Sequence, residues 1–233
     1  MKRLSDLMFA GVLLLLALPL MLFAIIGIKL NSTGPVLYYA LRVGVDGNTF
    51  KMFKFRSMHE TNSENRGAVI TAHDDKRVFW FGGFLRKTKI DELPQLLNVL
   101  IGNMSIVGPR PEDPKIVELY YANWMKMTLS VRPGVTSPGA IFYYAKCEDL
   151  IDKDDPEGSY ATLVLPLKMA VERAYLERAT WLSDLVCIAH TALAILGKMS
   201  NQPVLPFAGD LNAASKWVSS SAFSGTPKAR DPN

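Results

Sequence analysis

Residues 7–28 have the sequence LMFAGVLLLLALPLMLFAIIGI, an apolar run without a charged side chain. Its length of about 20 residues is what an α-helix needs to cross the hydrocarbon of a bilayer. The run is longer than the core of a signal peptide, and no small-x-small cleavage site follows it. We therefore expect residues 1–31 to form a membrane anchor that the protein keeps.

Pro19 lies near the middle of this run. Proline removes a backbone donor and clashes with the preceding turn, so it bends or breaks a helix. Lys2 and Arg3 precede the run and Lys29 follows it, and positive flanks tend to stay in the cytoplasm. A re-entrant helical hairpin, which enters and leaves by the same membrane face, satisfies both observations. A kinked single span is the alternative, and the run alone favours it, because proline is common in spanning helices.

The composition beyond this run is that of an ordinary soluble protein. The 233 residues suffice for one compact domain plus the anchor, and the formal net charge of +4 suits anionic lipid headgroups and anionic substrates. The basic residues are scattered and match no nucleic-acid-binding pattern, so nucleic acid is not an expected partner. Cys147 and Cys187 form no C-x-x-C pair, which argues against a disulfide framework or a zinc site.

The expected fold class is α/β, mostly helical with one small β-hairpin. Strands are expected at 36–39 and 49–57, around the turn signal Asp46-Gly47-Asn48. A polar loop should follow at 61–76, with helices at 78–86, 91–101, 115–127, 163–177 and 181–196. The apolar stripe of the last helix suits core packing and the membrane surface equally. Residues 32–200 should form the compact catalytic domain, and residues 201–233, rich in Ser, Pro, Gly and Ala, a flexible tail.

Asp91 and Glu92 are adjacent carboxylates at the start of the helix expected at 91–101. The helix dipole favours anions at this end, and its exposed N–H groups bind them. Acidic residues are also ordinary capping residues. The pair alone therefore favours a capping role over a catalytic one.

Five basic residues are candidates for phosphate binding: Lys54, Arg56, Arg86, Arg110 and Arg132. Lys54 and Arg56 are two positions apart in a strand, so they share one face. Arg110 and Arg132 stand beside proline and glycine, in GPRP (108–111) and VRPG (131–134). A rigid turn fixes the direction of a guanidinium, which suits bidentate binding of phosphate. A solvated arginine in a turn is the alternative.

Five motifs occur in one order along the chain: KR-x-x-D (2–6) before the apolar run, FKMFKFRSM (50–58), LRKTKIDELPQL (85–96), NMSIVGPRPE (103–112) and VRPGVT (131–136). Together they resemble the bacterial sugar transferase family, the monotopic phosphoglycosyl transferases that initiate glycoconjugate and exopolysaccharide synthesis. The resemblance runs from Lys2 to about Lys198, and the length is similar to that of the minimal members. Any one motif alone is weak, but five in register make chance agreement negligible.

The resemblance implies a re-entrant helix in the inner (cytoplasmic) membrane and a catalytic domain that faces the cytoplasm, with surface helices at the phospholipid interface. Asp91 would be the nucleophile and a ligand of an assisting Mg²⁺, and Glu92 its catalytic partner. The donor would be a UDP-sugar and the acceptor polyprenyl phosphate, usually undecaprenyl phosphate. The products would be UMP and a polyprenyl diphosphate sugar.

Three stretches depart from the family pattern. Leu18 stands where the family usually has serine before the membrane proline. Residues 78–83 replace a more basic stretch, and Ser137-Pro138-Gly139 follows Thr136 where the family often has Gly-Trp. Two other functions also fit parts of the sequence. One is a membrane-anchored phosphodiesterase that hydrolyses nucleotide sugars, and the other is a non-enzymatic membrane adaptor in polysaccharide export.

Overall fold

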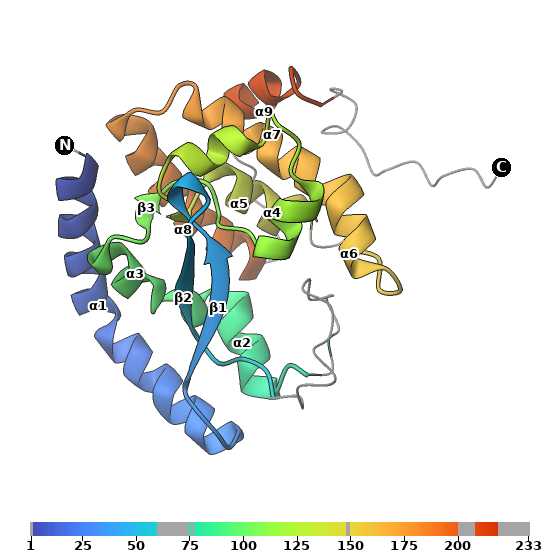
Figure 1. Ribbon diagram of the computed structural model, residues 1–233. Coiled ribbons are helices and arrows are strands. Elements are labelled where there is room, and N and C mark those ends of the chain that lie inside the picture. Colours follow the sequence, from blue (N-terminus) through green and yellow to red (C-terminus); the bar gives the residue numbers. More distant parts are fainter. Residues whose placement is uncertain (1, 60–74, 76, 148–149, 200–207, 219–233) are drawn as a thin grey trace.

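A computed structural model describes residues 2–59, 75, 77–147, 150–199 and 208–218. The polar loop expected at 61–76 lies almost wholly outside the described residues. Within them, the helix α1 (Lys2–Asn31) runs along one side of the molecule, and the remaining helices and two small sheets gather beside it (Figure 1). The α/β class with a predominance of helix agrees with the prediction.

The helix α1 is continuous through Pro19 over its 30 residues. Figure 1 shows that its axis changes direction partway along, so the predicted bend is present, but the helix is not broken into two halves. Among the described residues, α1 is the helix that is long and apolar enough to cross a membrane, judged by length and composition. Its buried positions form one narrow stripe that faces the body of the protein: Asp6, Ala10, Ala17, Ala24 and Ile28.

The predicted β-hairpin is confirmed. Strand β1 (Leu37–Val43) pairs antiparallel with β2 (Thr49–Phe55), from Leu37 opposite Phe55 to Val43 opposite Thr49. The connection contains the 3-10 turn η1 (Val45–Gly47), in which Asp46 and Gly47 have φ values of 56° and 79°. Asp and Gly tolerate this left-handed backbone better than most residues do, which is why their pair marks the turn.

The helix expected at 91–101 is divided. After α2 (Trp80–Thr88), a single 3-10 turn, η3 (Ile90–Glu92), carries the two carboxylates, and α3 (Gln95–Ile101) follows. Pro94 has no N–H to donate to the carbonyl one turn back, so the helical hydrogen-bond ladder is interrupted between the turn and the helix.

A second sheet was not predicted. Strand β3 (Ser105–Val107) pairs parallel with β4 (Gly134–Thr136). Three-residue strands are too short to show alternation in the sequence. Gly134 makes this pairing possible, because a Cβ at that position would lie 2.2 Å from the backbone nitrogen of Gly108. The sheet joins the segments that carry Arg110 and Arg132.

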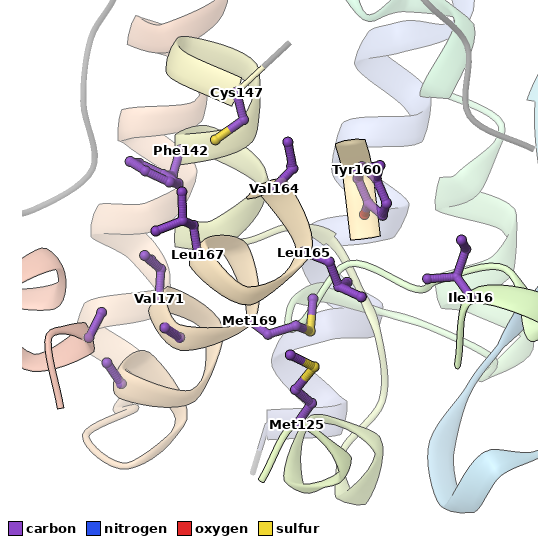
Figure 2. Close-up of a cluster of buried hydrophobic side chains, with 13 residues drawn as sticks. Ile116, Met125, Phe142, Cys147, Tyr160, Val164, Leu165, Leu167, Met169 and Val171 are labelled. Atoms are coloured by element: carbon purple, nitrogen blue, oxygen red, sulfur yellow. The ribbon is translucent and has the colours of Figure 1, made fainter. Parts of the chain in front are cut away.

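The remaining helical elements complete the body of the protein. They are α4 (Pro114–Tyr120), η4 (Lys126–Ser130), α5 (Pro138–Phe142), the π-helical turn η5 (Tyr143–Cys147), α6 (Pro156–Ser159), the π-helical turn η7 (Tyr160–Val164), α7 (Leu165–Leu176), α8 (Trp181–Met199) and α9 (Ala208–Ala214). The helix expected at 115–127 therefore ends early, at Tyr120. Figure 2 shows the core around α7, into which Leu165, Met169 and Val171 point.

Within the segment 201–233, expected to be a flexible tail, the structure describes residues 208–218, and these are folded. Helix α9 packs against α7, and Ala214 is fully buried. Beyond it, Trp217 stacks on Trp124 and lies under the guanidinium of Arg173, 3.5 Å from the ring centroid. The low-complexity composition obscured these few apolar contacts, and the rest of the tail lies outside the described residues.

We expect Gly134→Ala to destabilise the protein by more than about 2 kcal/mol, because the added methyl group collides with backbone that cannot move aside. Gly11→Ala in α1 is the matched control, since a Cβ there meets nothing within 4 Å. Thermal unfolding of both variants in detergent micelles measures the difference. Equal midpoints for the two variants would contradict the close approach of β3 and β4.

Candidate active site

Asp91 and Glu92 are buried residues, with exposed fractions of 4% and 8%. The short turn η3 places them against strand β2, from which Lys54 reaches both. The Lys54 Nζ lies 3.7 Å from Asp91 Oδ2 and donates a hydrogen bond of 3.1 Å to Glu92 Oε1. A residue of the hairpin and the adjacent pair, far apart in sequence, thus form one charged cluster.

Glu92 is held by three cations. The Arg110 guanidinium donates to both of its carboxylate oxygens, at 3.0 Å to Oε2 and 2.6 Å to Oε1. Lys89 Nζ lies 3.8 Å from Oε1, beside Lys54. Burial alone would raise the pKa of Glu92, but the charges of Arg110, Lys54 and Lys89 together hold it well below the usual value. Glu92 is therefore a fixed, ionised anchor for the cations around it.

Asp91 is in a different environment from its neighbour. Its Oδ1 is buried and has no hydrogen-bond partner among the described residues. Burial raises the pKa of Asp91, and the charge of Lys54 opposes this only in part. Adjacent carboxylates whose environments separate their pKa values are typical of catalytic sites, where the two groups have different roles. The available carboxylate oxygen of the pair belongs to Asp91.

The residues present fit a magnesium ion that is completed by substrate. The described residues contain no group of three His, Cys, Asp or Glu side chains that could hold a metal by themselves. Mg²⁺ is commonly held by one or two carboxylates together with water and substrate phosphates. Asp91 Oδ1, buried and without a hydrogen-bond partner among the described residues, would be one such ligand, whereas both oxygens of Glu92 are already bound by cations.

The structure brings three of the five predicted cations to this cluster. Lys54 and Arg110 contact the carboxylates directly. Arg86, in the last turn of α2, opposes by its charge the rise in the pKa of Asp91, and its guanidinium makes no hydrogen bond with another described residue. This half-buried guanidinium is therefore available to an anion.

Arg56 and Arg132 lie elsewhere. Arg56 is buried and donates to the carbonyl of Pro35, at 2.6 Å, and to the carbonyl and hydroxyl of Ser32, so it attaches the end of α1 to the hairpin. Arg132 is exposed, and its Nε donates to the carbonyl of Gly102 at 2.9 Å, just past the end of α3. Neither contacts Asp91 or Glu92.

Sequence reasoning did not single out Glu172, which lies behind Arg110. This fully buried carboxylate on α7 accepts hydrogen bonds through Oε1 from the Arg110 backbone N–H, at 3.2 Å, and from the Ser137 hydroxyl, at 2.5 Å. Its Oε2 has no partner among the described residues. Burial raises its pKa to about 7, although Ser137, Lys168 and the Arg110 backbone act in the opposite direction. Glu172 thus positions the turn from which Arg110 reaches Glu92.

The residues of this charged cluster come from the motifs that occur in order along the sequence, and their arrangement is that of an enzyme active site. The chain belongs to the bacterial sugar transferase family, whose sequence pattern matches residues 1–198. That span contains the whole charged cluster and both of its supporting sheets.

Individual relatives agree with this membership. The chain is 39% identical over 167 residues to a UDP-glucose:undecaprenyl-phosphate glucose-1-phosphate transferase of Klebsiella pneumoniae, covering 70% of this chain and 36% of that protein. It is 42% identical over 137 residues to a UDP-N-acetylgalactosamine-undecaprenyl-phosphate N-acetylgalactosaminephosphotransferase of Aeromonas hydrophila, covering 58% and 32%. It is 44% identical over 110 residues to an exopolysaccharide production protein of Rhizobium leguminosarum, covering 47% and 55%. The chain therefore spans between about a third and about half of the length of these relatives.

We expect Glu172→Gln to stabilise the protein at high pH relative to the wild type. A carboxyl whose pKa is raised in the folded state contributes stability below its ordinary pKa of 4.5, and that stability is lost as the pH rises through about 7. The difference between these pKa values corresponds to about 3 kcal/mol. The two proteins should unfold at similar temperatures at pH 5, and the variant should be the more stable at pH 8.

Thermal unfolding in detergent across this pH range measures the effect. Glu118→Gln, at an exposed position on α4, is the matched control and should follow the wild-type curve. Parallel curves for Glu172→Gln and the wild type would show that Glu172 is ionised in the folded protein.

Proposed function

We propose that this protein transfers a phosphosugar from a UDP-sugar to polyprenyl phosphate, and that Asp91 carries the phosphosugar in between. The observation that supports this most directly is the contrast within the carboxylate pair. Glu92 is bound on both oxygens, whereas Asp91 keeps a buried oxygen without a partner among the described residues. Family membership and the activities named for the relatives support the same reaction.

In the first step, an Asp91 carboxylate oxygen attacks the phosphorus that is bonded to the sugar. A bond forms between this oxygen and phosphorus, the bond to the bridging oxygen breaks, and UMP leaves with the electron pair. In the second step, an oxygen of the carrier phosphate attacks the same phosphorus and the bond to Asp91 breaks. The product is polyprenyl diphosphate sugar, and Asp91 returns to its free carboxylate. Neither displacement requires a proton transfer.

The main difficulty of this reaction is charge, because an anionic nucleophile approaches an anionic diphosphate. Catalysis of phosphoryl transfer consists largely of positioning and electrostatic stabilisation. Lys54 contacts both carboxylates, Arg110 lies beside Glu92, and Arg86 is close enough to act on Asp91. When bound at Asp91, Mg²⁺ would stabilise the carboxylate form and neutralise the donor diphosphate. The role of Glu92 in this proposal is to hold Arg110 and Lys54 in place.

The same proposal requires a cytoplasmic domain attached to the membrane, and the contacts of α1 support a re-entrant arrangement. Near its beginning, Arg3 donates to the Val99 carbonyl at 2.7 Å, and Asp6 accepts from Ser105 and from the Ile106 N–H. Near its end, Ser32 is bound by Arg56. Both ends of α1 contact the rest of the folded protein. If α1 crossed the bilayer, part of the folded protein beside it would therefore have to lie in the hydrocarbon region. Polar anchors such as Asp6 make that arrangement costly.

We expect both ends of α1 to lie in the cytoplasm. In a background without Cys147 and Cys187, Leu4→Cys and Leu30→Cys introduce thiols at exposed positions near the two ends. Both thiols should resist a membrane-impermeant reagent in intact cells and react in inverted membrane vesicles. Labelling of Leu4→Cys alone in intact cells would establish a single span.

We expect Asp91→Asn to abolish turnover while the protein still folds, because the change keeps the shape of the side chain and removes the nucleophile. Glu92→Gln should lower kcat by more than tenfold, equivalent to about 1.4 kcal/mol, since it weakens the grip on Arg110 and Lys54. Initial rates with undecaprenyl phosphate, magnesium and a panel of UDP-sugars should give the parallel double-reciprocal lines of a ping-pong scheme. Asp154→Asn, at an exposed carboxylate, is the control and should keep full activity.

Mass spectrometry provides a second readout of the same proposal. Wild-type protein mixed with donor alone should gain the mass of one phosphosugar, and hydroxylamine should remove it. Intersecting rate plots without a trapped adduct would support direct attack by the carrier. Continuous UMP release without carrier would identify a phosphodiesterase, and full glycan synthesis in cells that carry Asp91→Ala would identify a non-enzymatic adaptor.

A further inference from the structure

A cavity of about 430 Å³ opens beside the charged cluster and has no role in the steps above. This volume is in the range of sites that bind small organic ligands. Two helices from opposite ends of the chain form its apolar walls, through Leu13, Leu16 and Leu20 of α1 and Ile188, Ala192 and Ile195 of α8. The α1 residues that line the cavity lie on both sides of Pro19 in the sequence, so the bent part of the helix borders the cavity.

One end of the cavity is charged. Lys89, Glu92 and Arg110 line it, and Glu92 connects it to Lys54 and so to Asp91. Three cations, Lys54, Lys89 and Arg110, stand against the two carboxylates of the pair, so this end has an excess of positive charge. A cavity with apolar walls and a cationic end is complementary to an amphiphile with an anionic head.

Lys89 has an unusual backbone for its residue type. It ends α2 with φ 59° and ψ 14°, in the left-handed region where glycine or asparagine is the usual helix-ending residue. Its ammonium lies 4.5 Å from the centroid of the Tyr144 ring, and the Tyr144 hydroxyl donates to the Lys87 carbonyl at 2.7 Å. The Tyr144 ring is therefore held by the end of α2 and contacts the ammonium of Lys89, which ends that helix. Both side chains line the cavity. Backbone strain kept by such contacts is typical of functional positions.

The two substrates of the proposed reaction differ in whether they carry an apolar chain, which the apolar walls of this cavity would bind. A UDP-sugar is polar throughout, whereas the carrier has a phosphate joined to an isoprenoid chain. The apolar lining also continues outward, since Leu193 and Leu196 of α8 are exposed, as are most side chains of α1. A chain held between the helices can thus pass directly into lipid.

We propose that Lys89 is a further substrate-binding residue, which binds the phosphate of the polyprenyl carrier together with Arg110 while the first isoprene units lie between α1 and α8. This inference rests on the proposed function, because it assigns a place to the second substrate of that reaction. The carrier phosphate would then approach the phosphorus on Asp91 from the cavity, past Glu92.

The test uses the full-length protein in detergent, with undecaprenyl phosphate and the UDP-sugar that it turns over. Lys89→Asn removes the cation, and asparagine tolerates the left-handed backbone. The KM for carrier should rise at least tenfold while the KM for donor changes less than twofold, and Lys89→Arg should restore most of the loss. Ala192→Leu narrows the cavity between α1 and α8 and should also raise the carrier KM. Ala189→Leu, at an exposed position on α8 outside the cavity lining, is its matched control.

Different results would contradict the proposed function and the assignment of Lys89 to the carrier. A wild-type protein that neither releases UMP in the presence of carrier nor forms an adduct would overturn the proposed function. Normal UMP release with an unchanged carrier KM in both Lys89→Asn and Ala192→Leu would overturn this inference alone. An equal loss towards both substrates in Lys89→Asn, together with a lower unfolding temperature, would show that Lys89 only supports the fold.

Discussion

The pairing of Glu92 with Arg110 is the interaction on which the arrangement of the site depends. Its two hydrogen bonds connect the turn η3 to the segment after β3, and Lys54 brings β2 to the same carboxylate. Removing one partner from such a buried pair leaves an uncompensated charge, which is far more costly than the pair itself is stabilising. Three separate parts of the chain are therefore held at one point, and Asp91 is carried there by its peptide bond to Glu92.

A second carboxylate supports this point from behind. Glu172 accepts from the Arg110 backbone, and Ser137, which also donates to it, caps the start of α5 by accepting from the Ala140 N–H. A Cβ at Gly139 would lie 2.6 Å from the Glu172 carboxyl group, so the glycine leaves room for the acid. The guanidinium of Arg110 is thus aimed at Glu92 from a turn that α7 holds in position, and α7 itself lies in the largest apolar core of the described residues.

The sequence predicted the parts of this structure that depend on local patterns. The hairpin around Asp46-Gly47, the apolar helix and the stripe of α8 follow from turn chemistry and periodicity, and the adjacent carboxylates follow from motif order. The parallel pair β3–β4 is too short for any periodic signal. Arg110 and Arg132 both stand beside proline in the sequence, yet one holds Glu92 and the other donates to the Gly102 carbonyl. Glu172 and Lys89 resemble ordinary surface charges until tertiary contacts bury the first and direct the second, which no local pattern encodes.

The alanine stripe of α1 makes the membrane segment part of the folded body. Ala10, Ala17 and Ala24 bring the helix close to its neighbours, while most of the leucines, isoleucines and phenylalanines on its other faces are exposed. Two different rules of sequence change should therefore act within one helix. Lipid-facing positions can exchange freely among bulky apolar residues, but the stripe tolerates only small ones. An anchor transplanted from an unrelated membrane protein would supply hydrophobicity and still fail to fit, because this segment is selected as a packing surface as well as a lipid-soluble one.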